Sequence, residues 1–128
     1  MTLTTSTDRA LTGIGGQRIN QILASPYGDK SVNNYLNPAA FAQPALGALG
    51  NVGKGAVAGP GTWQFDTALS RTFQFNETQK LEFRAEAFNL TNSFHMNDPV
   101  TVLNQATFGQ VLSAKDPRIM QFALKYFF

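Results

Sequence analysis

His95 is the only histidine of the chain, and it is the first side chain to consider for metal binding or proton transfer. It lies in the run His95-Met96-Asn97-Asp98, which brings one carboxylate close in the sequence. A zinc site needs further ligands, and the chain has neither a cysteine nor a second histidine to supply them. We therefore expect His95 to lie on a solvated loop, and we predict no metal ligand.

Glu82 and Glu86 are the next candidates, because paired carboxylates can act together on one bond. The residues around them alternate in character as a strand does, and on a strand these two would stand roughly 13 Å apart. That separation is too large for a catalytic pair. With Arg84 between them they form a row of charges, which suits either the wall of a water-filled lumen or the wet face of a soluble sheet.

Glycine-rich stretches at residues 13–17 and 47–61 invite comparison with phosphate-binding loops. Neither follows a buried strand or ends in Gly-Lys-Ser/Thr, so we interpret these glycines as turn residues. The formal charge of +2 is spread over scattered residues, which indicates no nucleic-acid surface. No nucleophile with a base beside it is evident. We therefore predict that the chain is not an enzyme and has no catalytic residue and no cofactor.

The clearest structural pattern lies at the C-terminal end, in residues 118–128. From Met120 to Phe128 every second side chain is apolar or aromatic, while Gln121, Ala123 and Lys125 between them are small or polar, which predicts a strand with one apolar face. Such a strand would promote aggregation in water but would suit the wall of a membrane barrel, with Tyr126 and Phe128 in the aromatic girdle. The alternative is an ordinary C-terminal edge strand of a soluble sheet. This stretch alone supports the two interpretations equally.

Two further strands are predicted at residues 63–75 and 80–90, joined by a turn at 76–79. A helix competes for 80–90, but the period-two face is the cleaner one. Arg71 shares the parity of the apolar face, where a charge is unfavourable unless it reaches the membrane interface. We predict that these apolar residues face lipid: Phe65, Leu69, Phe73, Leu81, Phe83, Met120, Phe122, Leu124 and Tyr126. The predicted lumen-facing residues are Asp66, Ser70, Glu82, Arg84, Glu86, Gln121 and Lys125.

The segments between the strands differ in length. Residues 1–62 are dense in glycine, proline and asparagine, so we expect a long, mostly irregular segment. It holds at most a helical turn at 18–23 and another at 38–41, the latter capped by Asn37. Residues 91–117 form a second long connection. Short turns on one side and long loops on the other are typical of outer-membrane barrels.

The predicted fold class is therefore all-β, an antiparallel meander of about three long strands from the end of an outer-membrane barrel. Its predicted domains are an extracellular-loop-like segment at 1–62 and barrel strands at 63–128. No run approaches the roughly 18 apolar residues of a transmembrane helix, and the first residues do not resemble a signal peptide. An export signal is therefore expected upstream, in a longer protein of which this chain is the C-terminal part.

Several strings of residues carry a family resemblance. The most specific is Phe83-Arg84-Ala85-Glu86-Ala87-Phe88-Asn89-Leu90-Thr91-Asn92, together with the Phe128 ending. The others are Asn37-Pro38-Ala39-Ala40-Phe41, Gly59-Pro60-Gly61, Phe108-Gly109, and Asp116-Pro117-Arg118 with Gln121. In these strings the chain, from about residue 11 to 128, resembles the C-terminal barrel region of TonB-dependent receptors of the Oar-like type. Those proteins carry a carboxypeptidase-regulatory-like domain and a plug ahead of the barrel.

The resemblance implies a plugged outer-membrane barrel that takes up large or scarce solutes with energy passed from the inner membrane. The implied partners are the outer-membrane lipid, the remainder of the barrel and plug upstream, and the barrel-assembly machinery, for which Tyr126 and Phe128 would form the signal. The transported solute is not indicated. The expected function is thus that of a C-terminal piece of the barrel wall with its outer loops. The alternative is a small soluble β-rich interaction or adhesion module.

Overall fold

The structure is a computed structural model that describes residues 1–128, and it forms two compact units. The first unit contains residues 1–61 and 96–114, and the second contains residues 62–95 and 115–128. Most of the long connection that precedes the last strand therefore packs within the first unit. The periodicity of the sequence does not indicate that residues 96–114 pack with residues 1–61.

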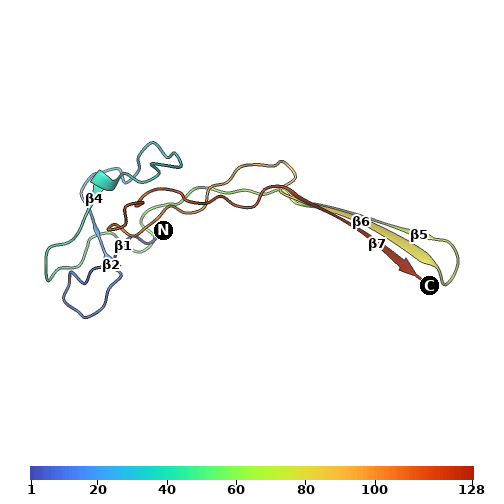
Figure 1. Ribbon diagram of the computed structural model, residues 1–128, viewed down its shortest axis with the longest axis horizontal. Helices are drawn as coiled ribbons and strands as arrows, with labels where there is room; N and C mark the ends of the chain where they lie inside the picture. Colours follow the sequence, from blue (N-terminus) through green and yellow to red (C-terminus); the bar gives the residue numbers. More distant parts are fainter. The chain divides into compact units, whose positions relative to one another are not determined.

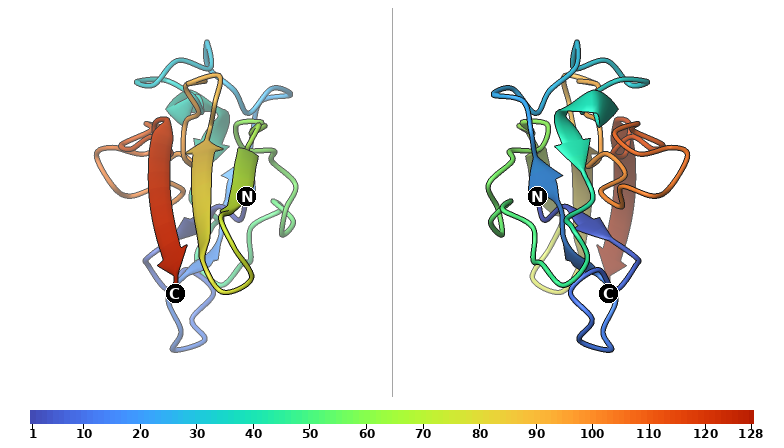
Figure 2. Two further views of the ribbon diagram at one scale, coloured as in Figure 1. Left: turned by 90° about the vertical axis from the view of Figure 1, so that its right-hand side faces the viewer. Right: turned by 90° about the vertical axis from the view of Figure 1, so that its left-hand side faces the viewer.

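The second unit contains a three-stranded antiparallel sheet (Figure 1). Its strands are β5 (Thr67–Gln74), β6 (Lys80–Phe88) and β7 (Ile119–Phe127), with β6 in the middle. Figure 2 shows them side by side, with β7 in red, β6 in yellow and β5 in green. The sheet confirms the predicted all-β class and the antiparallel meander, and residues 80–88 are a strand as expected.

Each strand is shorter than the sequence predicts. β5 begins at Thr67 instead of residue 63, although the Phe65 carbonyl still accepts a hydrogen bond from the Leu90 N–H at 2.9 Å. β6 ends at Phe88 because Asn89 adopts a left-handed conformation, with φ of 50°, that an extended strand does not contain.

A tight turn joins β5 to β6 at one end of the sheet, which we name the turn end. The Phe75 N–H donates to the Gln79 carbonyl at 3.0 Å. The side-chain oxygen of Asn76 accepts hydrogen bonds from the N–H groups of Thr78 and Gln79, at 3.1 and 2.7 Å. Asparagine side chains that bond to the backbone two residues further on favour turns. The turn expected at 76–79 is therefore present.

A buried asparagine joins the segments at the opposite end of the sheet, which we name the loop end. The Asn89 N–H donates to the Asp66 carboxylate at 2.9 Å, just before β5. The Asn89 side chain bonds both the N–H and the carbonyl of Ser93, each at 3.0 Å, and its Nδ2 lies 3.4 Å from the Asp116 carbonyl oxygen, just before β7. Asn89 is only 4% exposed, so these bonds are shielded from water. Through its backbone N–H and its side chain together, Asn89 thus links the segments at the ends of three strands.

The first unit has little regular structure, but it has a core. The short strands β1 (Thr4–Thr5) and β2 (Gln17–Arg18) pair antiparallel, and so do β3 (Asn20–Gln21) and β4 (Phe41–Ala42). Backbone hydrogen bonds hold the distant segment in place, such as that from Tyr35 N–H to the Gly109 carbonyl at 3.0 Å. The buried apolar residues come from segments far apart in the sequence: Leu3, Ile19, Tyr35, Leu36, Ala40, Phe41, Val52, Val57, Phe108 and Val111.

A 3-10 helix, η1 (Pro38–Ala40), precedes β4. Asn37 caps it by accepting a hydrogen bond from the Ala39 N–H at 3.0 Å, so the predicted helical turn at 38–41 is confirmed. The helical turn predicted at 18–23 is wrong, because the backbone there is extended and pairs with other strands. The structure contains no helix that is long and apolar enough to span a membrane.

Candidate functional site

The register of the sheet places most of the large apolar side chains of the three strands on one side, which we name the apolar face. Residues directly opposite one another in neighbouring strands share a face, so Phe73, Leu81 and Tyr126 form one row across the sheet. Phe65 precedes β5 and lies outside the paired residues. The other predicted lipid-facing residues all lie on the apolar face: Leu69, Phe73, Leu81, Phe83, Met120, Phe122, Leu124 and Tyr126.

The large apolar side chains that the two outer strands, β5 and β7, place on the apolar face are exposed. Phe122 is 66% exposed and Leu124 is 69% exposed. Phe83 stacks against Phe122 with ring centroids 6.4 Å apart, and Tyr126 stacks against Phe128 at 6.1 Å. A continuous apolar surface of this kind marks a place where a protein meets lipid or another protein.

The opposite side of the sheet, which we name the charged face, carries the polar residues of the strands. The predicted lumen-facing residues on it are Ser70, Glu82, Arg84, Glu86, Gln121 and Lys125. Arg84 Nη2 and Glu86 Oε1 form an ion pair at 2.8 Å. The Arg84 side chain is 55% exposed, so this pair contributes at most about 1 kcal/mol. Lys125 Nζ lies 4.5 Å from the centroid of the Phe127 ring.

Two shallow hollows on the charged face share Glu86. The larger has a volume of about 320 Å³ and is lined by Arg84, Glu86, Gln121, Phe122 and Ala123. The smaller, of about 190 Å³, is lined by Asp66, Thr67, Ala68, Glu86 and Phe88. Asp66 precedes β5, and its carboxylate accepts hydrogen bonds from Gln64 Nε2 at 2.7 Å and from the Asn89 N–H. The predicted lumen-facing carboxylates Asp66 and Glu86 therefore lie around one hollow.

Three large apolar residues of the charged face were not singled out by the sequence pattern. Phe88 and Ile119 are paired neighbours at the loop end, and Phe127 lies opposite Lys80 at the turn end. Each is 38–42% exposed. Each of the three has the same parity as the charged residues of its own strand, so the period-two pattern could have placed all three on the charged face. The charged face is polar in its middle and apolar at both ends.

His95 lies beside Trp63, with the two rings edge to face and their centroids 5.9 Å apart. Its Nε2 atom is buried and has no hydrogen-bond partner. The structure contains no group of three or more histidine, aspartate or glutamate side chains that could hold a metal ion. The surroundings of His95 therefore offer packing and no ligand set.

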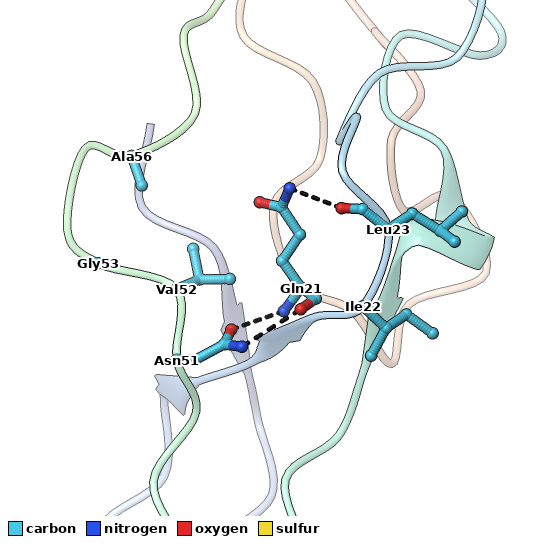
Figure 3. A pocket seen from close by; sticks show the side chains of 7 residues that line it. All are labelled: Gln21, Ile22, Leu23, Asn51, Val52, Gly53 and Ala56. Atoms are coloured by element: carbon cyan, nitrogen blue, oxygen red, sulfur yellow. Dashed lines mark hydrogen bonds between the residues drawn. The ribbon is translucent and has the colours of Figure 1, made fainter.

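The first unit has a hollow of its own, of about 360 Å³ (Figure 3). Its lining includes Asn51, whose side chain accepts from the Gln21 N–H at 2.8 Å and donates to the Gln21 carbonyl at 3.2 Å. The Gln21 side chain donates to the Leu23 carbonyl at 2.8 Å. These bonds fasten β3 to the segment after residue 50. No titratable side chain lines the hollow, so it has no group for acid–base chemistry.

The geometry of the sheet defines a class of protein. Its strands contain 8, 9 and 9 residues, close to the roughly 9–11 that cross the hydrocarbon of a membrane in a tilted barrel strand. One face is apolar, the other is charged in its middle, and neighbouring strands are antiparallel. Such a sheet is the wall of a membrane barrel, in which one face meets lipid and the other lines the interior.

The comparison with known families agrees with this class. The outer membrane beta barrel domain family matches residues 1–121, so the chain belongs to that family. Membership assigns the chain to the wall of an outer-membrane barrel and points to the bacterial outer membrane as its location. No curated protein and no solved structure matches the chain.

Proposed function

We propose that this chain forms part of the wall and the outer loops of a TonB-dependent receptor, which is an outer-membrane transporter. The apolar face meets lipid, and the charged face lines the lumen. The turn at 75–79 lies on the periplasmic side, and the long segments 1–62 and 91–117 are extracellular loops, because barrels of this kind have short periplasmic turns and long extracellular loops. The chain itself has no catalytic role.

The register of the sheet carries the assignment of the two faces. In the opposite orientation Glu82, Arg84 and Glu86 would all point into hydrocarbon. A single arginine or lysine near the middle of the membrane costs about 2–4 kcal/mol. Exposed rings such as those of Phe83 and Phe122 have no such cost in lipid. The orientation with the apolar face outward is therefore strongly preferred.

The narrower assignment to a receptor of the Oar-like type is supported by the string at residues 83–92 and by the Phe128 ending. Asn89 lies within this string and links the segments at the loop end, so the string has a structural role in this chain. The proposal implies a longer exported protein with a plug and further strands upstream. The barrel-assembly machinery is the proposed partner of Tyr126 and Phe128. The proposal names no transported solute.

Cysteine labelling tests the facing of the sheet, and the chain has no natural cysteine to interfere. Ser70→Cys and Gln121→Cys place a thiol on the charged face, and Leu69→Cys and Phe122→Cys place one at adjacent positions on the apolar face. In isolated outer membranes a charged maleimide is expected to label the first pair only. A lipid-soluble maleimide should label the second pair, which shows that those thiols are reactive.

Equal labelling of both pairs by the charged reagent contradicts the assignment of the faces. Labelling of all four in protein that does not sediment with membranes supports a soluble interaction module instead. The receptor identity has a separate test in the DNA upstream of the gene. An in-frame plug and export signal are expected there, and a barrel without a plug would contradict the receptor while leaving the wall intact.

A further inference from the structure

Arg71 is the only charged residue on the apolar face of the paired strands. It lies directly opposite Phe83, between Leu69 and Phe73 on its own strand. No acidic residue shares this face, and the ion pair of the sheet lies on the other side. The guanidinium of Arg71 therefore has no protein partner of opposite charge.

The guanidinium of Arg71 lies against an aromatic ring on the turn side of its own position. Its Cζ atom lies 5.6 Å from the centroid of the Phe73 ring, and Phe73 is two residues nearer to the turn at 75–79. Long basic side chains in membranes extend in this way to bring the charged group to the interface while the stem stays in hydrocarbon. The ring of Phe73 supports the guanidinium by a cation–π contact.

We propose that Arg71 binds the phosphate of a phospholipid in the membrane leaflet at the turn end, the periplasmic leaflet. The guanidinium has five donors in a planar fork that fits phosphate oxygens, and the neighbouring Leu69 and Phe83 offer an apolar surface for the acyl chains. The anionic phosphate supplies the charge that the apolar face lacks. This inference rests on the proposed assignment of the apolar face to lipid.

Vesicle partitioning tests the proposal with the complete chain of 128 residues. The chain is diluted from urea into vesicles of phosphatidylcholine, which has a phosphate but no net charge, or of digalactosyl diacylglycerol, which has no phosphate. Arg71→Gln is expected to lower the partition coefficient for phosphatidylcholine roughly five-fold, which corresponds to about one net hydrogen bond, and to leave that for the galactolipid unchanged. Arg71→Lys should retain most of the binding, because lysine also binds phosphate as a point charge.

Arg84→Gln is the matched control, since it makes the same charge change on the charged face. It should partition like the natural chain into both vesicles. Equal losses for Arg71→Gln and Arg84→Gln, or an equal loss for Arg71→Gln in both lipids, contradict phosphate binding by Arg71. A natural chain that partitions into neither vesicle contradicts phospholipid binding by this sheet, and the cysteine labelling described above then decides the facing of the sheet separately.

A second measurement does not depend on insertion from urea. The natural chain and Arg71→Gln are extracted from outer membranes in mild detergent and weighed by native mass spectrometry. The natural chain is expected to retain one phospholipid that Arg71→Gln has lost, with circular dichroism showing that both are β-structured. Equal lipid retention by the two proteins would overturn the proposal.

Discussion

At the scale of single residues, Asn89 has the most concentrated set of contacts in the sheet unit. Its backbone is left-handed, a conformation that asparagine tolerates better than other residues with a side chain. That conformation ends β6, and the same residue bonds to Asp66, Ser93 and Asp116. Asn89 therefore determines where the strand stops and also how the adjoining segments are held.

Asn89→Ala is expected to loosen the loop end of the sheet. The N–H and the carbonyl of Ser93 lose their partly buried hydrogen bonds, each of which contributes about 0.5–1.5 kcal/mol. Hydrogen exchange of the Ser93 amide in detergent-solubilised protein should accelerate at least roughly tenfold. Asn89→Asp is the control, because it keeps an acceptor for the Ser93 N–H. Unchanged Ser93 exchange in Asn89→Ala would show that the side chain does not hold this segment.

Asp8 makes the first unit sensitive to acid. Hydrogen bonds to its carboxylate, first that from the Thr12 N–H and then those from Gly13 and Gln17, lower the pKa of Asp8 below its usual 3.8. A lowered pKa stabilises the loop at pH values above the unfolded pKa, and this contribution is lost as the pH falls through the folded pKa. The amide proton signals of Thr12 and Gly13 should therefore titrate with a midpoint below 3.8.

Asp8→Asn should abolish this titration, because the amide does not ionise. Asp29→Asn is the matched control, since the pKa of Asp29 is also lowered, by hydrogen bonds from Ser31 in a different loop. It should leave the titration of the Thr12 and Gly13 signals intact. A midpoint at or above 3.8 in the natural chain would contradict the hydrogen bonding described for Asp8.

At the scale of elements, the sequence predicts the sheet well because the two faces of each strand lie in unlike environments. Side chains that alternate between lipid and water leave a period of two, and this pattern is local in the sequence. The strand ends depend on single conformations, such as that of Asn89, which periodicity does not reveal. The prediction that β5 begins at residue 63 is wrong because apolar and polar side chains already alternate before Thr67, where the paired backbone begins.

The structure of the first unit could not be predicted from a repeating pattern in the sequence. Its core residues, such as Leu3, Ile19 and Val52, stand alone between polar or glycine residues, so no repeat marks them as buried. Their burial depends on contacts between segments tens of residues apart. The candidate hollow beside Gln21 and Asn51 likewise depends on long-range hydrogen bonds. Local pattern predicts only that this region contains many turns and the short helical turn capped by Asn37.

Gly109→Ala is expected to destabilise the first unit. Gly109 has φ of +80°, and a Cβ atom there would lie 2.5 Å from the Leu36 carbonyl oxygen. Left-handed backbone and the close contact together should cost more than about 1 kcal/mol. Urea unfolding in detergent, followed by the near-ultraviolet circular dichroism of the tyrosines, should show a lower midpoint.

Gly61→Ala is the matched control for this substitution. A Cβ atom at Gly61 would have no heavy atom within 4 Å, and its backbone is not left-handed. Replacing such a glycine by alanine leaves stability unchanged or raises it by about 0.4–1 kcal/mol. A fall in the midpoint for Gly61→Ala as large as that for Gly109→Ala would contradict the explanation from backbone conformation.

At the scale of the whole molecule, the sheet has two free edges. β6 is paired on both sides, whereas β5 and β7 each leave one row of backbone groups without a partner in the sheet. Three strands cannot close on themselves, since the smallest membrane barrels have about eight. Unpaired backbone groups in hydrocarbon cost several kcal/mol each. A stable wall therefore needs further strands against β5 and β7, from a longer chain or from other copies.

The direction of the strands limits how that wall can be completed. β5 and β7 are both antiparallel to β6, so they run parallel to each other. A ring built only of copies of this sheet would join β7 of one copy to β5 of the next in parallel. Bacterial outer-membrane barrels are antiparallel throughout, with an even number of strands. An antiparallel wall thus requires an odd number of additional strands between the two edges.

Size-exclusion chromatography of residues 1–128 expressed alone tests most directly whether the apolar face is built for lipid. Exposed side chains such as Phe122 and Leu124, next to an unpaired strand edge, make the sheet a template for aggregation in water. The chain is expected to elute as aggregate in buffer and as a detergent complex in micelles. A monodisperse, detergent-free monomer with β-type circular dichroism and a cooperative melt would contradict the barrel wall and support a soluble module.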